Sequence, residues 1–338
     1  MRLFNLSKLF LIVLSTICLI SCKTKTYSPS SKGAPYDVFV VMDTNKWNGE
    51  LGLAFKKILS QTVPMLNQPE PMFRVASFPK KDFQRLTKLG RTIIIVQSDN
   101  KFQSTQMQAT YDLYAKPQIV ITVTGPTDTA IINYVALKGN ALKTVINMFE
   151  RDRFVESTQN NFNGELSNLI QQKFDFKLTL PIEYKLRVNV PDFLWISNEL
   201  PVVSQGVVIY SYPYEGQNTF TLNKMIENRN KFVNKYIPGP SEGSFMTTAS
   251  EDVAERQIRK LMINGREWYE IRGFWDVEND YMGGPFISYS TLDTRTNRVI
   301  VIDNYLYSPK KPKRNFYRQL ENIVYMAKFP GDPTHNSL

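Results

Sequence analysis

The sequence predicts an α+β protein in two parts, and two observations lead to this prediction. Between residues 36 and 174, apolar strand-like runs alternate with helix-like stretches, which is the order of an α/β domain. From residue 177 on, strand-like runs follow one another with short turns between them, which favours an antiparallel sheet covered by helices. We therefore expect an N-terminal α/β domain over residues 36–176 and a C-terminal antiparallel α/β sandwich domain over residues 177–330.

The first residues predict export and a lipid anchor. A basic start precedes an apolar run from Leu9 to Ile20, which is shorter than the roughly 20 residues that span a bilayer. The run ends at Leu19-Ile20-Ser21-Cys22, which resembles the lipobox of bacterial lipoproteins, where the cysteine is lipidated. We expect a signal peptide over residues 1–21, lipidation of Cys22, and a flexible polar tether over residues 22–35.

The residues after Cys22 and the charge of the chain bear on location and partners. In some bacteria acidic residues after the lipidated cysteine direct export to the cell surface, whereas here Lys23-Thr24-Lys25-Thr26 follow. We therefore expect a protein of the outer membrane that faces the periplasm and is held to the membrane by its lipid. Its formal net charge of +10 favours an anionic partner, such as an envelope protein or glycan. Nucleic acid is not expected in this compartment.

The residue counts exclude several kinds of catalysis. His335 is the single histidine, and it lies in a tail over residues 331–338 that we expect to be disordered. Cys18 belongs to the predicted signal peptide, so no free thiol remains beyond Cys22. Histidine-dependent triads, cysteine nucleophiles and His/Cys zinc sites therefore cannot be built. We expect no cofactor and no metal, and carboxylate chemistry is the main catalytic alternative left.

The elements of the N-terminal part follow from its apolar runs. Unbroken runs predict strands at 37–43, 73–78, 92–96 and 119–123. Helical spacing predicts a helix that Pro64 stops and a shorter helix from Lys80 to Leu89. A largely helical region then extends from Pro126 to about Phe174.

The elements of the C-terminal part are fixed best by its turns. We expect strands at 193–197 and 207–212, a helix that Thr219 or Thr221 caps and that ends at Tyr236, and a last helix over 312–329. Asn264-Gly265 predicts a two-residue hairpin turn that pairs Leu261 with Trp268, Arg259 with Glu270 and Ile258 with Ile271. A second hairpin joins 286–292 to 299–307, and Val299–Ile302 is expected to be a central strand.

Several of these turns resemble those of a known family. Tyr210-Ser211-Tyr212-Pro213-Tyr214, Ile237-Pro238-Gly239-Pro240 and Met282-Gly283-Gly284-Pro285-Phe286 resemble the Bacteroidota lipoproteins that carry the domain of unknown function 4837, as do Tyr36-Asp37-Val38 and Trp47. The resemblance implies an envelope lipoprotein and brings no catalytic residues with it. The order of elements in the C-terminal half is also similar to the PsbP/Mog1 type of α/β/α sandwich.

An acidic segment is the best candidate for catalysis. If Asp276, Glu278 and Asp280 are extended, they share one face at about 6.6 Å per step, a spacing that suits an inverting glycosidase or a calcium site. A solvated turn between two strands explains the same residues.

Aromatic and basic side chains are the candidates for binding. Trp275 and Tyr281 stand out among the aromatics that could form a platform for a sugar or a partner, although aromatic residues in strands are often core. Arg272, Lys311 and Arg314 are the basic candidates. Lys311 and Arg314 lie at the start of the last helix, the unfavourable end for cations, which could mark an anionic contact.

The sequence therefore favours a non-catalytic binding or envelope-assembly factor over an enzyme. One alternative is a glycan hydrolase that uses the carboxylates of residues 276–280. The other is a binder of an anionic ligand or polysaccharide that uses the basic segment.

Overall fold

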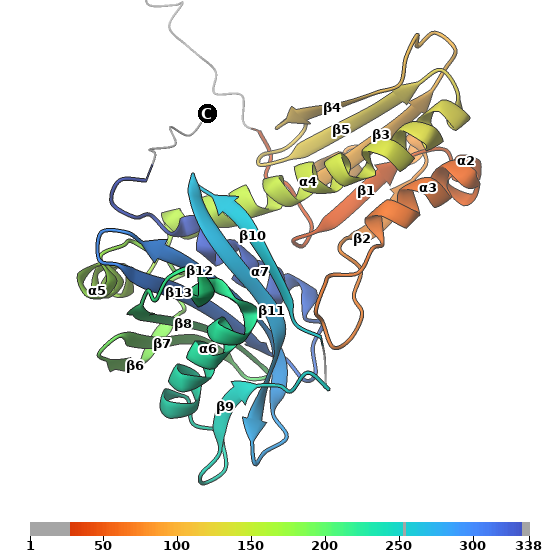
Figure 1. The fold of residues 1–338 in the computed structure, drawn as a ribbon. Helices are drawn as coiled ribbons and strands as arrows, with labels where there is room; N and C mark the ends of the chain where they lie inside the picture. Colours follow the sequence, from red (N-terminus) through yellow and green to blue (C-terminus); the bar gives the residue numbers. More distant parts are fainter. Residues whose placement is uncertain (1–27, 253–254, 333–338) are drawn as a thin grey trace, which may run out of the picture.

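The computed structural model describes residues 28–252 and 255–332, so Cys22 and His335 lie outside the described residues. These residues form two separate sheets, each with its own helices (Figure 1). The first has the order β2-β1-β3-β5-β4, and the second has the order β10-β11-β12-β13-β8-β7-β6 with β9 paired to β11. The predicted α+β class is confirmed. None of the described helices is both long enough and apolar enough to cross a membrane.

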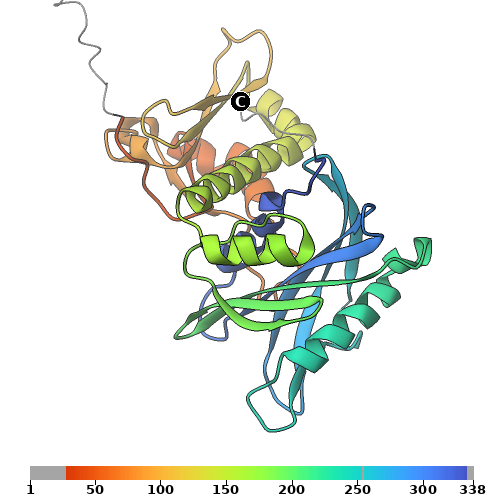
Figure 2. The same cartoon turned by 90° about the vertical axis from the view of Figure 1, so that its left-hand side faces the viewer.

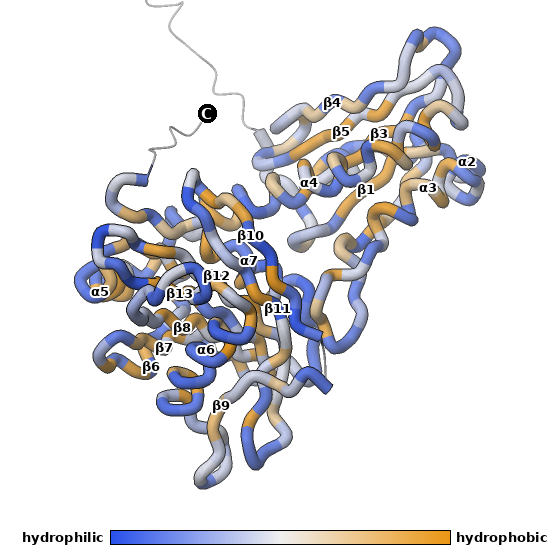
Figure 3. The backbone as a smooth tube through the Cα atoms, in the orientation of Figure 1, coloured by the Kyte–Doolittle hydropathy of each residue, from blue (hydrophilic) through white to orange (hydrophobic). Residues whose placement is uncertain are grey.

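The first sheet is a mixed sheet with a parallel centre. Its strands are β1 (Asp37–Val41), β2 (Arg74–Phe78), β3 (Thr92–Ser98), β4 (Gln106–Tyr111) and β5 (Ile119–Gly125), of which β4 alone is antiparallel to its neighbour. Apolar side chains are buried on both faces of β1, β3 and β5, which Figure 3 shows mostly in orange. This is why their sequences are unbroken apolar runs. The helices on one face are α2 (Thr44–Asn48), α3 (Glu50–Leu59) and α4 (Asp128–Asn160).

Two expectations for this part were wrong. The segment from Lys80 to Leu89 is not one helix but two short 3-10 turns, η1 (Lys80–Asp82) and η2 (Thr87–Leu89). The reason is local: Thr87 Oγ1 accepts a hydrogen bond from Gln84 N, and Phe83 packs on the second face of the sheet. The strand β4 was not predicted, because its exposed positions break the apolar pattern.

The region from Pro126 to Phe174 is largely helical, as predicted, and it consists of two helices. Thr127 caps α4 by accepting a hydrogen bond from Ala130 N, and Asn163 caps α5 (Gly164–Phe174) in the same way through Leu166 N. The apolar side of α5 belongs to the core of the second sheet, where it packs with Phe176 and Leu194. The expected start of the C-terminal domain at residue 177 therefore comes after a helix that already packs on the second sheet.

The second sheet is antiparallel throughout. Its strands are β6 (Lys185–Val190), β7 (Phe193–Leu200), β8 (Val203–Pro213), β9 (Phe245–Thr248), β10 (Gln257–Ile263), β11 (Arg266–Glu278), β12 (Gly283–Asp293) and β13 (Arg298–Tyr307). The three cross-strand pairs predicted around Asn264-Gly265 are all present, and both turn residues have positive φ. The strand β13 is central, as predicted, whereas β6 and β9 were not predicted.

Helices cover both faces of this sheet. On one face η3 (Gln217–Phe220) and α6 (Leu222–Tyr236) pack, and on the other α5, α7 (Arg314–Ile323) and η4 (Val324–Met326) pack. The last helix, α7, extends only from Arg314 to Ile323, so it is shorter than the predicted 312–329. Successive side chains of β11 point to opposite faces of the sheet. Trp268 therefore lies in the core under α5 and α7, and Trp275 lies in the core under α6.

The two ends of the described chain are attached to the fold. Ser30 and Lys32 form isolated bridges with Lys116 and Gly90, so the expected tether over 22–35 is wrong for its last residues. At the other end Asp332 forms an ion pair of 2.8 Å with Arg266, so the expected disordered tail does not begin at residue 331.

The two sheets meet through α7, which lies between α4 and the second sheet in both views (Figures 1 and 2). Arg318 Nη2 donates to Asn147 Oδ1 of α4 at 3.0 Å, and Asn322 Nδ2 donates to Tyr36 Oη at 3.3 Å. This contact creates a cleft between α4 and the hairpin of β10 and β11.

Candidate functional site

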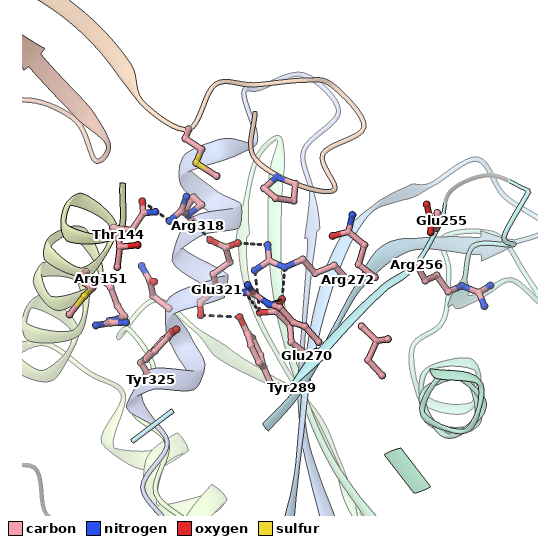
Figure 4. Close-up of a pocket in the computed structure, with 18 residues that line it drawn as sticks. Thr144, Arg151, Glu255, Arg256, Glu270, Arg272, Tyr289, Arg318, Glu321 and Tyr325 are labelled. Carbon is pink, nitrogen blue, oxygen red and sulfur yellow. Dashed lines mark hydrogen bonds and ion pairs between the residues drawn. The ribbon is translucent and has the colours of Figure 1, made fainter. Parts of the chain in front are cut away.

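A cavity with a volume of about 860 Å³ lies between α4 and β10, and we call it the α4–β10 cleft (Figure 4). Five elements and one loop form it: α4, α7 with the turn after it, β10 with the residues before it, β11, β12, and the segment between α3 and β2. Its lining residues are Pro64, Met72, Thr144, Asn147, Met148, Arg151, Glu255, Arg256, Gln257, Ile258, Arg259, Glu270, Arg272, Tyr289, Arg318, Glu321, Asn322 and Tyr325.

A network of charged side chains forms the floor of the α4–β10 cleft. Glu270 on β11 accepts two hydrogen bonds from Arg259 on β10, at 2.6 and 2.9 Å, because the hairpin register places the two residues opposite each other. Arg272, two residues further on the same face of β11, donates to Glu270 at 2.7 Å and to Glu321 of α7. Glu321 also pairs with Arg318 one helical turn away, at 2.5 Å. The floor therefore ties the hairpin to α7.

The network keeps the carboxylate of Glu270 ionised. Burial alone would raise the pKa of Glu270, but the hydrogen bonds from Arg259 and Arg272 outweigh it and hold the pKa below its ordinary value. The pKa of Arg272 is raised well above its ordinary value, since attraction to Glu321 and Glu270 exceeds the effect of burial. A general acid needs the opposite environment, with a carboxyl pKa raised toward neutrality. The floor therefore stabilises ionised side chains and does not provide a proton donor.

Positive charge is in excess around the α4–β10 cleft. Five arginines line it, against three glutamates, although Arg256 turns its guanidinium group away from the floor and pairs with Glu251 at 3.2 Å. Arg272 and Arg318 are buried in the floor, whereas the side chain of Arg259 is 62% exposed at the rim. Arg151 stacks on the ring of Tyr325 at 4.3 Å, and Arg256 Nη2 donates to Ala249 O at 2.8 Å. An anion in the cleft would meet guanidinium groups that are already positioned.

The structure brings one of the predicted binding residues into this site and leaves the others elsewhere. Arg272 lies in the floor of the α4–β10 cleft. Lys311 is exposed, outside the lining, and Arg314 donates from Nη1 to Pro71 O at 3.2 Å. The amide groups at the start of α7 are already used, because the Glu70 carboxylate accepts hydrogen bonds from Lys313 N and Arg314 N. The anionic contact expected at this basic segment is therefore a contact within the chain.

The predicted acidic face does not form. Asp276 and Glu278 end β11, but Asn279 has a φ of 64°, so the chain turns before Asp280. Asp280 instead accepts hydrogen bonds from Ser241 Oγ and from Tyr281 N. None of the three carboxylates lines the α4–β10 cleft, and the described residues contain no group of three or more acidic, histidine or cysteine side chains placed to hold a metal.

The predicted aromatic platform was also wrong. Trp275 is 2% exposed and donates from Nε1 to Leu306 O at 3.2 Å, whereas Tyr281 stands fully exposed in the turn before β12. Trp275 is buried in the core under α6 and Tyr281 lies beyond the end of β11, so the two do not form one exposed surface. Trp275 does border a second cavity of about 400 Å³, together with Trp195, Tyr305 and Tyr307.

Most residues of the α4–β10 cleft had no signal in the sequence. The pair of Arg259 and Glu270 was the exception, since the hairpin register predicted it. Arg318 and Glu321 are three residues apart on the last helix, which is a detectable spacing. Their meeting with Arg272 and with Asn147 depends on how the two sheets pack, and no local pattern encodes that.

The fold and this site define the class of the protein: an α+β protein with an arginine-lined cleft between an α/β part and an antiparallel sheet. Residues 163–326 match the family of the domain of unknown function DUF4837, and residues 31–162 match the domain of unknown function DUF8532. The resemblance to the DUF4837 family that the turns indicated is therefore found over residues 163–326. The DUF4837 match covers α5 and the second sheet, whereas the motifs around Tyr36 and Trp47 fall in the DUF8532 match.

Comparisons with other proteins add little. The sequence matches no curated protein. The crystal structure of the Ran-binding protein Mog1p from Saccharomyces cerevisiae is similar over 45% of this chain and 89% of its own, at 8% identity and a TM-score of 0.29. A crystal structure from Bacteroides thetaiotaomicron is similar over 46% of each chain, at 4% identity and a TM-score of 0.19. Scores this low establish no shared function.

Proposed function

We propose that this protein is a non-catalytic binding protein of the cell envelope and that its α4–β10 cleft holds an anionic ligand. The observation that supports this most is the excess of arginines over glutamates in the lining of this cleft. Arg259 is largely exposed although both its hydrogen bonds to Glu270 hold its head group in place. A fixed guanidinium loses little conformational freedom when an anion binds.

The chemistry of the floor favours binding over hydrolysis. Both oxygens of Glu270 accept hydrogen bonds from arginines, and its pKa lies below the ordinary value, so it is a poor proton donor near neutral pH. The glycan hydrolase alternative depends on Asp276, Glu278 and Asp280, and the turn at Asn279 takes Asp280 off the line of β11. A carboxylate pair across a cavity, which glycoside hydrolysis requires, has less support than an anion site.

The envelope location is part of the same proposal and rests on the sequence. The apolar run that ends at Cys22 supports a lipid anchor, and Lys23 and Lys25 after it support retention on the periplasmic side of the outer membrane. A cleft held at this place would meet proteins and glycans of the envelope, some of which are acidic.

Binding of a fluorescent anion tests the cleft. A short poly-glutamate peptide and a hyaluronate oligosaccharide serve as probes, and fluorescence anisotropy gives their Kd. Arg151→Glu and Arg259→Gln should each weaken binding by about tenfold or more, because a charged hydrogen bond contributes about 1.5–3 kcal/mol. Arg85→Glu is the matched control, since Arg85 is exposed and lies outside the cleft. Equal Kd values for all three variants would contradict the proposal.

A further inference from the structure

The strand β10 is an edge of the second sheet. It pairs with β11 on one side, and on its other side the sheet ends. The strand is unusually open for a member of a sheet: residues 257–260 are exposed, Ile258 by 40%, and Met262 is exposed by 64%. An open edge presents main-chain donors and acceptors to any extended chain that approaches it.

The hairpin register identifies the open main-chain groups. In a two-residue hairpin the residues on either side of the turn exchange main-chain hydrogen bonds, so Ile263 and Arg266 form a hydrogen-bonded pair. Along an antiparallel ladder hydrogen-bonded pairs alternate with pairs that are not hydrogen-bonded. The N–H and C=O groups of Ile258, Lys260 and Met262 therefore point away from β11. Among the described residues, no main-chain hydrogen bond joins these three to another element.

This edge opens on the α4–β10 cleft. Residues 255–259 line the cleft one after another, so side chains from both faces of the strand border it. Met148 of α4, which is 46% exposed, also lines the cleft. The space beside β10 thus has polar main-chain groups on one side, exposed apolar side chains of Ile258 and Met148, and the guanidinium groups of Arg151 and Arg259 around them.

We propose that the ligand of the cleft is an extended acidic segment of a partner protein, which adds to β10 as a further strand. This inference rests on the proposed function, because it names the class of anion that the cleft holds. The added strand would satisfy the open groups of Ile258, Lys260 and Met262. Its acidic side chains would meet the arginines, and main-chain bonding would supply affinity while side chains supply specificity.

The charges on β10 explain why an acidic strand is favoured over a second copy of this chain. Two β10 strands that paired with each other would bring Arg259 and Lys260 of one copy close to the same residues of the other. Like charges across a strand pair are destabilising, whereas opposite charges stabilise it. The same cations that oppose self-pairing therefore attract an acidic strand.

Two matched comparisons test strand addition. The probe is a fluorescent peptide of alternating Glu and Val, about seven residues long, and its control has the same side chains with every main-chain amide N-methylated. On the protein, Lys260→Pro removes an outward N–H without touching the ladder to β11, and Lys260→Thr removes the same charge but keeps the N–H. Binding should weaken by about tenfold or more on N-methylation, and by as much in Lys260→Pro relative to Lys260→Thr.

The possible results separate this inference from the proposed function. If the peptide binds and neither comparison changes its Kd, the cleft holds anions but strand addition is wrong. If hyaluronate binds as tightly as the peptide, the acidic-segment assignment is wrong as well. If no anion binds, the proposed function itself fails. Self-association of the wild type that Lys260→Pro abolishes would assign the edge to a second copy and overturn the inference. Should Lys260→Pro unfold the protein, the N-methylated peptide still decides.

Discussion

Glu70, in the segment before β2, caps the last helix of the chain by accepting a hydrogen bond from Lys313 N at 2.5 Å. Its second oxygen accepts from Arg314 N at 3.0 Å. A carboxylate at this position satisfies helix amides that have no partner within the helix and complements the helix dipole. It also accounts for the cations at the unfavourable end of α7, because the negative charge of Glu70 lies among them.

Removal of this cap should destabilise the protein. Glu70→Ala leaves two amides of α7 without their acceptor, so the free energy of unfolding should fall by about 1–2 kcal/mol. Urea unfolding measures this change in the free energy of unfolding. Glu242→Ala is the control, since Glu242 is exposed in the loop before β9. If both variants unfold at the same urea concentration as the wild type, the cap contributes nothing.

The floor network should make stability depend on pH. The folded-state pKa of Glu270 lies below its ordinary value of 4.5, so its carboxylate stabilises the fold above that pH. The stabilisation is lost as the pH falls through the folded-state pKa. Glu270→Gln should cost about 3 kcal/mol at neutral pH, and the difference from the wild type should shrink below pH 4.5.

Unfolding curves at several pH values give this difference. Glu278→Gln serves as the control, because Glu278 is exposed at the end of β11 and makes no ion pair among the described residues. A deficit of Glu270→Gln that stays constant from neutral to acid pH would argue against an ionised, stabilising Glu270.

The hairpin turn should tolerate substitution poorly. Gly265 has a φ of 78° next to Asn264 at 52°, a conformation that costs a residue with a side chain about 1–2 kcal/mol. Gly265→Ala should therefore lower the melting temperature. Gly164→Ala at the start of α5 is the matched control, where an added methyl group has no close neighbour. Equal melting temperatures for the two variants would contradict the assigned turn.

The lipid anchor is predicted at Cys22, which lies outside the described residues, and a substitution can test it. Cys22→Ala removes the predicted site of lipidation, so the protein should move from the membrane fraction to the soluble fraction. Cys18→Ala, within the predicted signal peptide, should leave it in the membrane fraction. A Cys22→Ala protein that stays with membranes after a carbonate wash would show that the lipobox prediction is wrong.

Local patterns predicted much of the fold and little of the site. The Asn264-Gly265 turn fixed a register of three pairs correctly because turn geometry and strand pairing are both local. The strand β6 was not predicted, although Leu186, Val188 and Val190 alternate with polar residues as in a half-buried strand. The cleft was missed because Arg272 meets Glu321, and Arg318 meets Asn147, only after two sheets pack around α7.

The central claim is that the charge of the α4–β10 cleft selects its ligand, and reversal of that charge tests it most directly. The measurement is the ratio of Kd values for a poly-glutamate and a poly-lysine peptide of equal length, in the wild type and in the double variant Arg151→Glu with Arg259→Gln. The wild type should prefer poly-glutamate, and the double variant should lose this preference or invert it. An unchanged ratio in a folded double variant would show that the arginines of the cleft do not select the ligand.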